Sequence, residues 1–158
     1  MQDVWYRFCL SQLNGSADRA ADATQETALR FLKQLKTFRG ESQLQTWSLG
    51  IALNVAREMR RKVRPASELN EELDREPQLA TERSSVGSQA EQSEQREIVS
   101  KHLAALPERQ REALVLRFFE DLSTEQTAAA MKCAEGTVKA TVHQALRALR
   151  LKMTQSLT

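Results

Sequence analysis

The sequence predicts an all-α protein, in which two small helical domains are joined by a flexible acidic linker and the second contains a helix-turn-helix. The 158-residue chain has only five Gly and three Pro, and its apolar residues recur at helical spacing without a strand-like alternating run. The distribution of charge along the chain predicts its division into two domains and a linker. Residues 1–65 carry 11 basic and 6 acidic side chains, residues 66–97 carry 3 and 9, and residues 98–158 carry 9 and 6. Basic blocks of net charge +5 and +3 on either side of an acidic connector are compatible with two contacts to a polyanion.

The first domain, residues 1–65, is expected to contain three helices. A short apolar helix over residues 4–13 ends at an Asn-Gly-Ser turn, and a longer amphipathic helix follows over residues 18–38. The third helix begins at a capping-box pattern at Ser42 and ends in five cations within eight positions: Arg57, Arg60, Arg61, Lys62 and Arg64. Cations favour the C-terminal end of a helix, but five exceed what the helix dipole requires, so phosphate contact is favoured here.

The linker is predicted at residues 66–93, which are rich in Glu, Ser and Gln and contain no aromatic residue. Such a composition cannot bury enough apolar surface to order itself. The second domain, residues 94–158, resumes with a helix over residues 94–106. Another helix starts at Pro107, and its core residues are expected to be Ala113, Leu114, Leu116, Phe118 and Phe119.

The helix-turn-helix is predicted between Leu122 and Lys152. Ser123 and Gln126 form a capping-box pattern for its first helix, and Gly136 is expected to supply the backbone angles of the turn. The second helix has an apolar stripe, and its other face carries hydrogen-bond donors: Lys139, Thr141, His143, Gln144, Arg147 and Arg150. Such a face suits the acceptors of a DNA major groove. The simpler alternative is a solvated amphipathic hairpin.

Several other classes of protein find no support in the sequence. Cys9 and Cys133 make no disulfide framework and have no His at metal-ligand spacing. A phosphate-cradling Gly loop, a nucleophile motif and a metal constellation are absent, so we expect no enzyme, cofactor or metal. No apolar run approaches the ~20 residues that span a bilayer, and the first ten residues do not resemble a signal peptide. A soluble cytoplasmic protein is therefore expected.

Two stretches carry a family likeness. TFRGESQLQTWSLGIALNVAREMRRK resembles region 2 of bacterial RNA polymerase sigma factors of the extracytoplasmic-function (ECF) group, and LPERQREALVLRFFEDLSTEQTAAAMKCAEGTVKATVHQALRALR resembles their region 4. Together with DATQETALRFLKQL, the likeness covers most of the chain outside the linker. Each motif alone is moderately specific for the family, but the occurrence of all of them in the family's order is a strong indication. The resemblance implies a promoter-specificity subunit whose partners are core RNA polymerase, promoter DNA and an anti-sigma factor.

The resemblance also implies three sets of binding residues. Core polymerase would contact the longer helix of the first domain, unless these residues are merely a solvated face: Asp22, Gln25, Glu26, Arg30 and Lys33. A base of the minus-10 element would be extruded from the stack and read by a loop and the helix after it: Phe38, Arg39, Gly40, Glu41, Ser42, Trp47, Asn54, Arg57 and Arg61. The minus-35 element would be bound by the second helix of the helix-turn-helix: Thr137, Lys139, Ala140, Thr141, His143, Gln144 and Arg147.

Individual members of these sets differ in what they are expected to do. Asn54 occupies the position that reads the flipped base in several relatives, whereas Trp47 also falls on the apolar stripe of its helix and fits a core role equally well. Thr137 and Arg147 are expected to contact phosphates, which position a helix without reading sequence. Gln144 can bond an adenine edge.

Three features depart from the family pattern. Ala134 stands where many relatives have Ser, and Thr141 or Gln144 stands where many have Arg. Relatives also have a helix-forming stretch before the equivalent of Val4, so the chain is either trimmed or reduced in its first domain.

The alternative functions are a stand-alone helix-turn-helix regulator of duplex DNA and a module that binds only protein. The FRGES…TW…IALN block argues against the regulator, which has no reason to carry it.

Overall fold

A computed structural model of the protein describes residues 1–63 and 90–156. Within these ranges the regular elements are all helices, which confirms the all-α prediction. Most of the predicted linker, residues 66–89, lies outside the described residues. No helix in the described part of the chain is long and apolar enough to cross a membrane.

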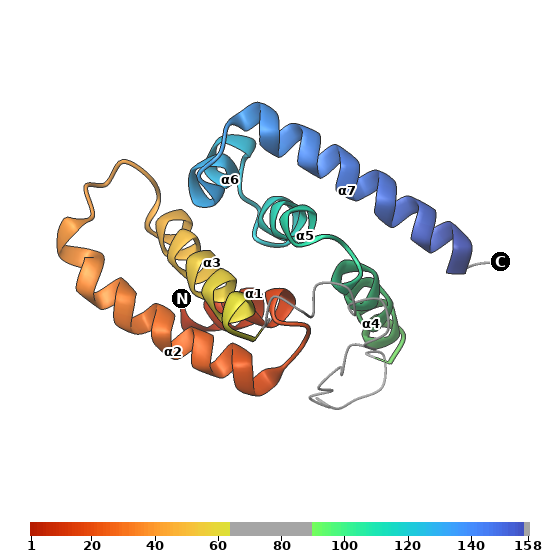
Figure 1. Cartoon of the computed structure of the whole chain (residues 1–158), viewed down its shortest axis with the longest axis horizontal. Coiled ribbons are helices and arrows are strands. Elements are labelled where there is room, and N and C mark those ends of the chain that lie inside the picture. Colours follow the sequence, from red (N-terminus) through yellow and green to blue (C-terminus); the bar gives the residue numbers. More distant parts are fainter. Residues whose placement is uncertain (64–89, 157–158) are drawn as a thin grey trace.

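The first three helices form one group in the left half of Figure 1. They are α1 (Gln2–Gln12), α2 (Ala17–Gln34), which is extended by a turn of 3-10 helix η1 (Leu35–Thr37), and α3 (Leu44–Val63). The predicted turn between α1 and α2 is present, and its residues Asn14 and Gly15 have positive φ angles of 55° and 71°. The predicted cap at Ser42 is wrong, because α3 begins two residues later, at Leu44.

The second group contains α4 (Ala90–Ala104), α5 (Glu108–Leu114), η3 (Val115–Phe119), α6 (Thr124–Met131) and α7 (Glu135–Ser156). α4 begins four residues earlier than the sequence predicts. α6 and α7 form the predicted helix-turn-helix, and Figure 1 shows α7 as a long helix over the outer side of this group.

The start of the helix-turn-helix agrees with the sequence, whereas its turn does not. The Ser123 Oγ accepts a hydrogen bond from the Gln126 backbone N–H at 3.0 Å, and the Gln126 side chain accepts one from the Ser123 N–H at 2.8 Å, which is the predicted capping box. The left-handed residue of the turn is Lys132, with φ 55°, and Gly136 lies inside α7. The glycine is therefore not what allows this turn.

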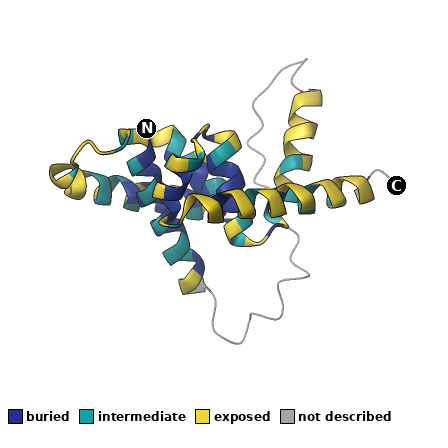
Figure 2. Ribbon diagram, turned by 90° about the horizontal axis from the view of Figure 1, so that it is seen from above, coloured by how far each residue is buried: buried dark blue, intermediate teal, exposed yellow. Residues whose placement is uncertain are grey.

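Buried side chains from both halves of the chain form one continuous core, and the ribbon in Figure 2 is dark blue where residues are buried. Its largest fully buried members include Phe8 on α1, Leu53 on α3 and Leu116 in η3. The two predicted domains are thus packed against each other, with α6 of the second lying beside α3 of the first (Figure 1).

Two of the five residues predicted in the core of the second group are not buried. Ala113, Leu114 and Leu116 are buried, but Phe118 and Phe119 are 51% and 50% exposed. The chain adopts a turn of π-helix from Val115 to Phe119. Because a π turn takes in more residues than an α turn, it shifts the side chains that follow away from the buried stripe.

Candidate functional site

The residues predicted to bind the minus-35 element lie along the outer face of α7. Six of the seven are exposed, and the seventh, Thr141, is partly buried. On the opposite face, Val138 and Ala145 are 1% and 0% exposed and fix the helix to the core. The predicted division of α7 into a buried stripe and a donor-bearing face holds at Val138 and Ala145, but it is wrong for Leu146 and Met153, which continue the apolar stripe and are 44% and 40% exposed.

A shallow hollow of about 240 Å³ adjoins this face. Lys139 and His143 of α7 contribute to its wall, together with Arg117 of η3. The Arg117 guanidinium lies 5.5 Å from the centre of the Phe118 ring, a cation–π distance. Cationic and donor groups from two elements thus surround the same depression.

The loop between η1 and α3 forms a second hollow, of about 190 Å³. Its lining includes four of the predicted minus-10 residues from the loop and one from α3: Phe38, Arg39, Glu41, Ser42 and Trp47. Gly40, with φ 71°, turns the chain within this loop, a conformation that side chains other than glycine rarely adopt.

Trp47 serves both the hollow and the packing of the first group. The centre of its ring lies 4.8 Å from the ring centre of Phe38 and 5.7 Å from that of Phe31. The ring centre of Phe31 lies in turn 5.2 Å from that of Trp5. The Trp5 Nε1–H donates to the Ser48 Oγ at 3.0 Å. This aromatic row joins α1, α2 and α3 and holds the loop against the helices.

Asn54, Arg57 and Arg61 lie further along α3 and do not line this hollow. Asn54 follows Trp47 by seven residues, which places it on the same face but about 10 Å along the axis. Asn54 is partly buried, whereas Arg61 is exposed. The structure therefore does not bring all the predicted minus-10 residues into one pocket.

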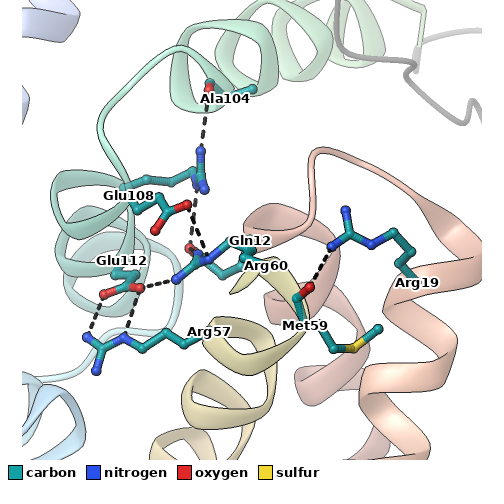
Figure 3. Close-up of polar contacts among 9 residues, drawn as sticks. Gln12, Arg19, Arg57, Met59, Arg60, Ala104, Glu108 and Glu112 are labelled. Atoms are coloured by element: carbon teal, nitrogen blue, oxygen red, sulfur yellow. Dashed lines mark hydrogen bonds and ion pairs between the residues drawn. The ribbon is translucent and has the colours of Figure 1, made fainter. Parts of the chain in front are cut away.

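Arg57 has an acidic partner that the sequence did not reveal. Its guanidinium donates to both carboxylate oxygens of Glu112 on α5, from Nε at 3.1 Å and from Nη2 at 2.7 Å. Arg60 Nη2 donates to the same carboxylate, as Figure 3 shows. Burial alone would raise the pKa of Glu112, but the hydrogen bonds and charges of Arg57 and Arg60 outweigh it and hold the pKa below its usual range.

The residues predicted to bind core polymerase lie on α2 in two different environments. Asp22, Gln25 and Lys33 are exposed. Arg30 instead donates to Glu26 at 2.8 Å and to both oxygens of Glu58 on α3 at 3.0 and 2.6 Å. These hydrogen bonds raise the pKa of Arg30 and lower that of Glu58. Arg30 thus ties α2 to Glu58 on α3, while Glu26 pairs with Arg30 within α2.

A row of exposed leucines along α2 and η1 is a candidate binding surface that the sequence did not reveal. Leu29, Leu32 and Leu35 are 56%, 64% and 41% exposed. Their three-residue spacing places them along one side of the helix. Helical periodicity alone gives no sign that α1 and α3 cover only part of the apolar side of this helix.

Both halves of the chain match sigma-factor families. The family Sigma-70 region 2 matches residues 2–65, and the family Sigma-70, region 4 matches residues 96–149. The ECF RNA polymerase sigma factor EcfG of Rhodopseudomonas palustris is 38% identical over 133 residues, which are 84% of this chain and 70% of the relative. SigX of Bacillus subtilis is 31% identical over 146 residues, 86% of this chain and 71% of SigX.

The fold agrees with that of a solved sigma factor. RpoE of Bartonella quintana, in complex with the anti-sigma factor NepR, superposes with a TM-score of 0.77 at 26% identity. The match covers 97% of this chain and 91% of RpoE. A stand-alone regulator would not carry the region 2 half, and sigma factors are not enzymes. The chain belongs to the ECF group of the sigma-70 family, whose members bind RNA polymerase and direct transcription initiation at promoters.

Proposed function

We propose that the two halves of the chain divide promoter recognition between them. Residues 1–65 bind core polymerase through α2 and the minus-10 strand through the loop 38–42 and α3. Residues 94–158 bind the minus-35 duplex through the exposed face of α7, and residues 66–93 connect the two.

The observation that carries this proposal is the two-sided character of α7. Lys139, His143, Gln144 and Arg147 are exposed, while the side facing the core is apolar. A helix presented in this way can enter a major groove and bring donors to base edges and phosphates without disturbing its own packing.

The hollow beside Trp47 supports the minus-10 assignment. An extruded base needs a recess with an aromatic wall for stacking and polar groups for its edge. Phe38 and Trp47 supply aromatic rings, while Arg39, Glu41 and Ser42 supply donors and acceptors.

In vitro transcription from a genomic fragment library tests the function as a whole. Core polymerase with this protein is expected to start at sites that share two spaced upstream elements, and core alone is not. If the protein binds core but yields no new start sites, promoter recognition by this chain is contradicted. If it binds neither core nor DNA, a module that binds only some other protein becomes the better explanation.

Replacing Gln144 with Ala is expected to relax selection at one position of the minus-35 element, by about 1–3 kcal/mol if the amide bonds a base edge. Start-site selection on a randomised upstream element measures this change. Arg147→Ala is the control, because loss of a phosphate contact weakens all sequences equally. An equal loss across all sequences for Gln144→Ala would make this residue a backbone contact.

Replacing Asn54 with Ala is expected to impair selection of one minus-10 base and to leave the affinity for core polymerase unchanged. The amide offers both a donor and an acceptor to a base edge, and alanine offers neither. Transcription from templates randomised at the downstream element gives the readout, alongside a core-binding measurement. An unaltered base preference would remove Asn54 from the reading set.

We further infer that the protein acts in the cytoplasm, where its polymerase and DNA partners are found, and that an anti-sigma factor controls it. The support is the similar Bartonella quintana sigma factor, which was solved in complex with such a protein.

A further inference from the structure

The aromatic row of the first half runs from the buried core to the hollow beside Trp47. Its inner end is Trp5 on α1, which is only 5% exposed and does not line the hollow. Phe31 separates Trp5 from Trp47, and its ring centre lies 5.2 Å from the one and 5.7 Å from the other. These are distances at which tilted aromatic rings attract each other. Any influence of Trp5 on the hollow therefore passes through other side chains.

Trp5 also holds the start of α3 through a chain of two hydrogen bonds. Its Nε1–H donates to the Ser48 Oγ at 3.0 Å, and the Ser48 hydroxyl donates in turn to the carbonyl oxygen of Gln45 at 2.8 Å. Ser48 is fully buried, and hydrogen bonds linked in this way inside a protein strengthen one another. Because Trp47 lies between Gln45 and Ser48 in the sequence, the chain of bonds fixes the turn of helix that carries Trp47.

The position of Trp47 makes such support necessary. Trp47 follows the first residue of α3 by only three positions, and helix ends fray. Its ring is partly exposed and forms a wall of the hollow together with Phe38. A wall that is already held in place loses less conformational entropy when a ligand stacks on it, and so binds the ligand more tightly.

We propose that Trp5 is a positioning residue for the capture of a minus-10 base. It holds Phe31 and the first turn of α3 so that Trp47 presents its ring to the hollow, and it does not touch the DNA itself. This inference rests on the proposed assignment of the hollow to an extruded base, and it adds the residue that sets the geometry of the aromatic wall. The competing explanation is that Trp5 only fills the core.

The test measures how tightly the complex of the protein with core polymerase binds a radiolabelled single DNA strand that carries the minus-10 element selected by the wild type. Trp5→Leu removes both the ring and the N–H donor, and is expected to weaken strand binding about tenfold at unchanged affinity for core polymerase. Phe8→Leu is the matched control. Phe8 is fully buried on the same helix but lies outside the aromatic row, so this variant is expected to bind the strand as the wild type does.

Two further variants test the hydrogen bond by itself. Trp5→Phe keeps a buried ring but has no donor, and is expected to weaken strand binding about threefold. Ser48→Ala removes the same bond from its other end and is expected to give a similar loss. Because both substitutions break one interaction, the double variant is expected to lose no more than either single variant.

A strand that lacks the captured base distinguishes positioning from general damage to the fold. Each position of the element is made abasic in turn, and the wild type is expected to lose affinity where the missing base would enter the hollow. On that strand Trp5→Leu and the wild type are expected to bind equally, because Trp47 has no base on which to act. A residue that only fills the core would weaken binding to both strands by the same factor.

The outcomes separate the positioning role from the assignment on which it rests. If Trp5→Leu binds the intact strand as Phe8→Leu does, or loses equally on the intact and abasic strands, the positioning role is overturned. Helix content by circular dichroism identifies a variant that unfolds, and if Trp5→Leu does so, Trp5→Phe decides by the same comparison. If no abasic position weakens binding by the wild type, the assignment of the hollow to a base fails, and the inference fails with it.

Discussion

Replacing both Leu29 and Leu32 with Asp is expected to weaken binding to core polymerase by about 100-fold and to abolish promoter-directed transcription. These side chains are more than half exposed on α2, the helix assigned to polymerase. Complete burial of a leucine contributes about 1.5–3 kcal/mol, so covering the remaining exposed part of two leucines is worth roughly 3 kcal/mol, or about two powers of ten in affinity. Aspartate removes this gain and adds charges that are costly to desolvate.

The measurement is a titration of labelled protein with core polymerase. Leu151→Asp is a matched control, because Leu151 is 59% exposed but lies on α7, outside the proposed polymerase surface. The thermal stability of the double variant is expected to stay close to that of the wild type, since neither leucine belongs to the buried core. An unchanged affinity for core polymerase would show that this apolar row faces something else.

Replacing Phe8 with Ala is expected to cost about 3–5 kcal/mol of the free energy of unfolding. Phe8 is fully buried on α1, within the core that joins both halves of the chain, and alanine would leave a cavity there. The loss is a large share of the about 5–15 kcal/mol that stabilises a typical protein, and would lower Tm by about 10 °C at roughly 2–4 °C per kcal/mol.

Thermal unfolding followed by far-UV circular dichroism measures this loss. Leu32→Ala provides the comparison, because Leu32 is 64% exposed and truncation of such a side chain usually changes stability by less than about 0.5 kcal/mol. If Phe8→Ala and Leu32→Ala melt at the same temperature, the two halves do not depend on α1 for their packing.

Local signals in the sequence predicted local structure well. The capping box at Ser123 and Gln126 involves residues three positions apart, so its pattern identifies it directly. The sequence predicts the wrong residue for the turn after α6. A left-handed residue is most often glycine, but here Lys132 takes that conformation and Gly136 lies nearby in α7. The spacing of a regular α-helix predicts Phe118 and Phe119 in the core, whereas the chain makes a π turn there.

Contacts between distant residues could not be predicted in the same way. Glu112 pairs with Arg57 across 55 positions and a linker, and periodicity within either helix gives no information about such a pair. The candidate sites show the same division. The donor face of α7 follows from its own helical pattern, whereas the separation of Asn54 from the hollow at Trp47 depends on how the loop 38–42 folds against α3.

The aromatic row of the first half also allows DNA binding to be followed by the protein's intrinsic tryptophan fluorescence. Both tryptophans of the chain, Trp5 and Trp47, lie there, and the residues after α3 are therefore silent in tryptophan emission. Trp5 is shielded, at 5% exposure, and supplies a steady background, while Trp47 borders the hollow. A base that stacks there would quench the fluorescence of Trp47 and not that of Trp5. The rate of binding of the minus-10 strand could therefore be measured in unlabelled protein, whereas DNA binding at α7 would not change the tryptophan fluorescence.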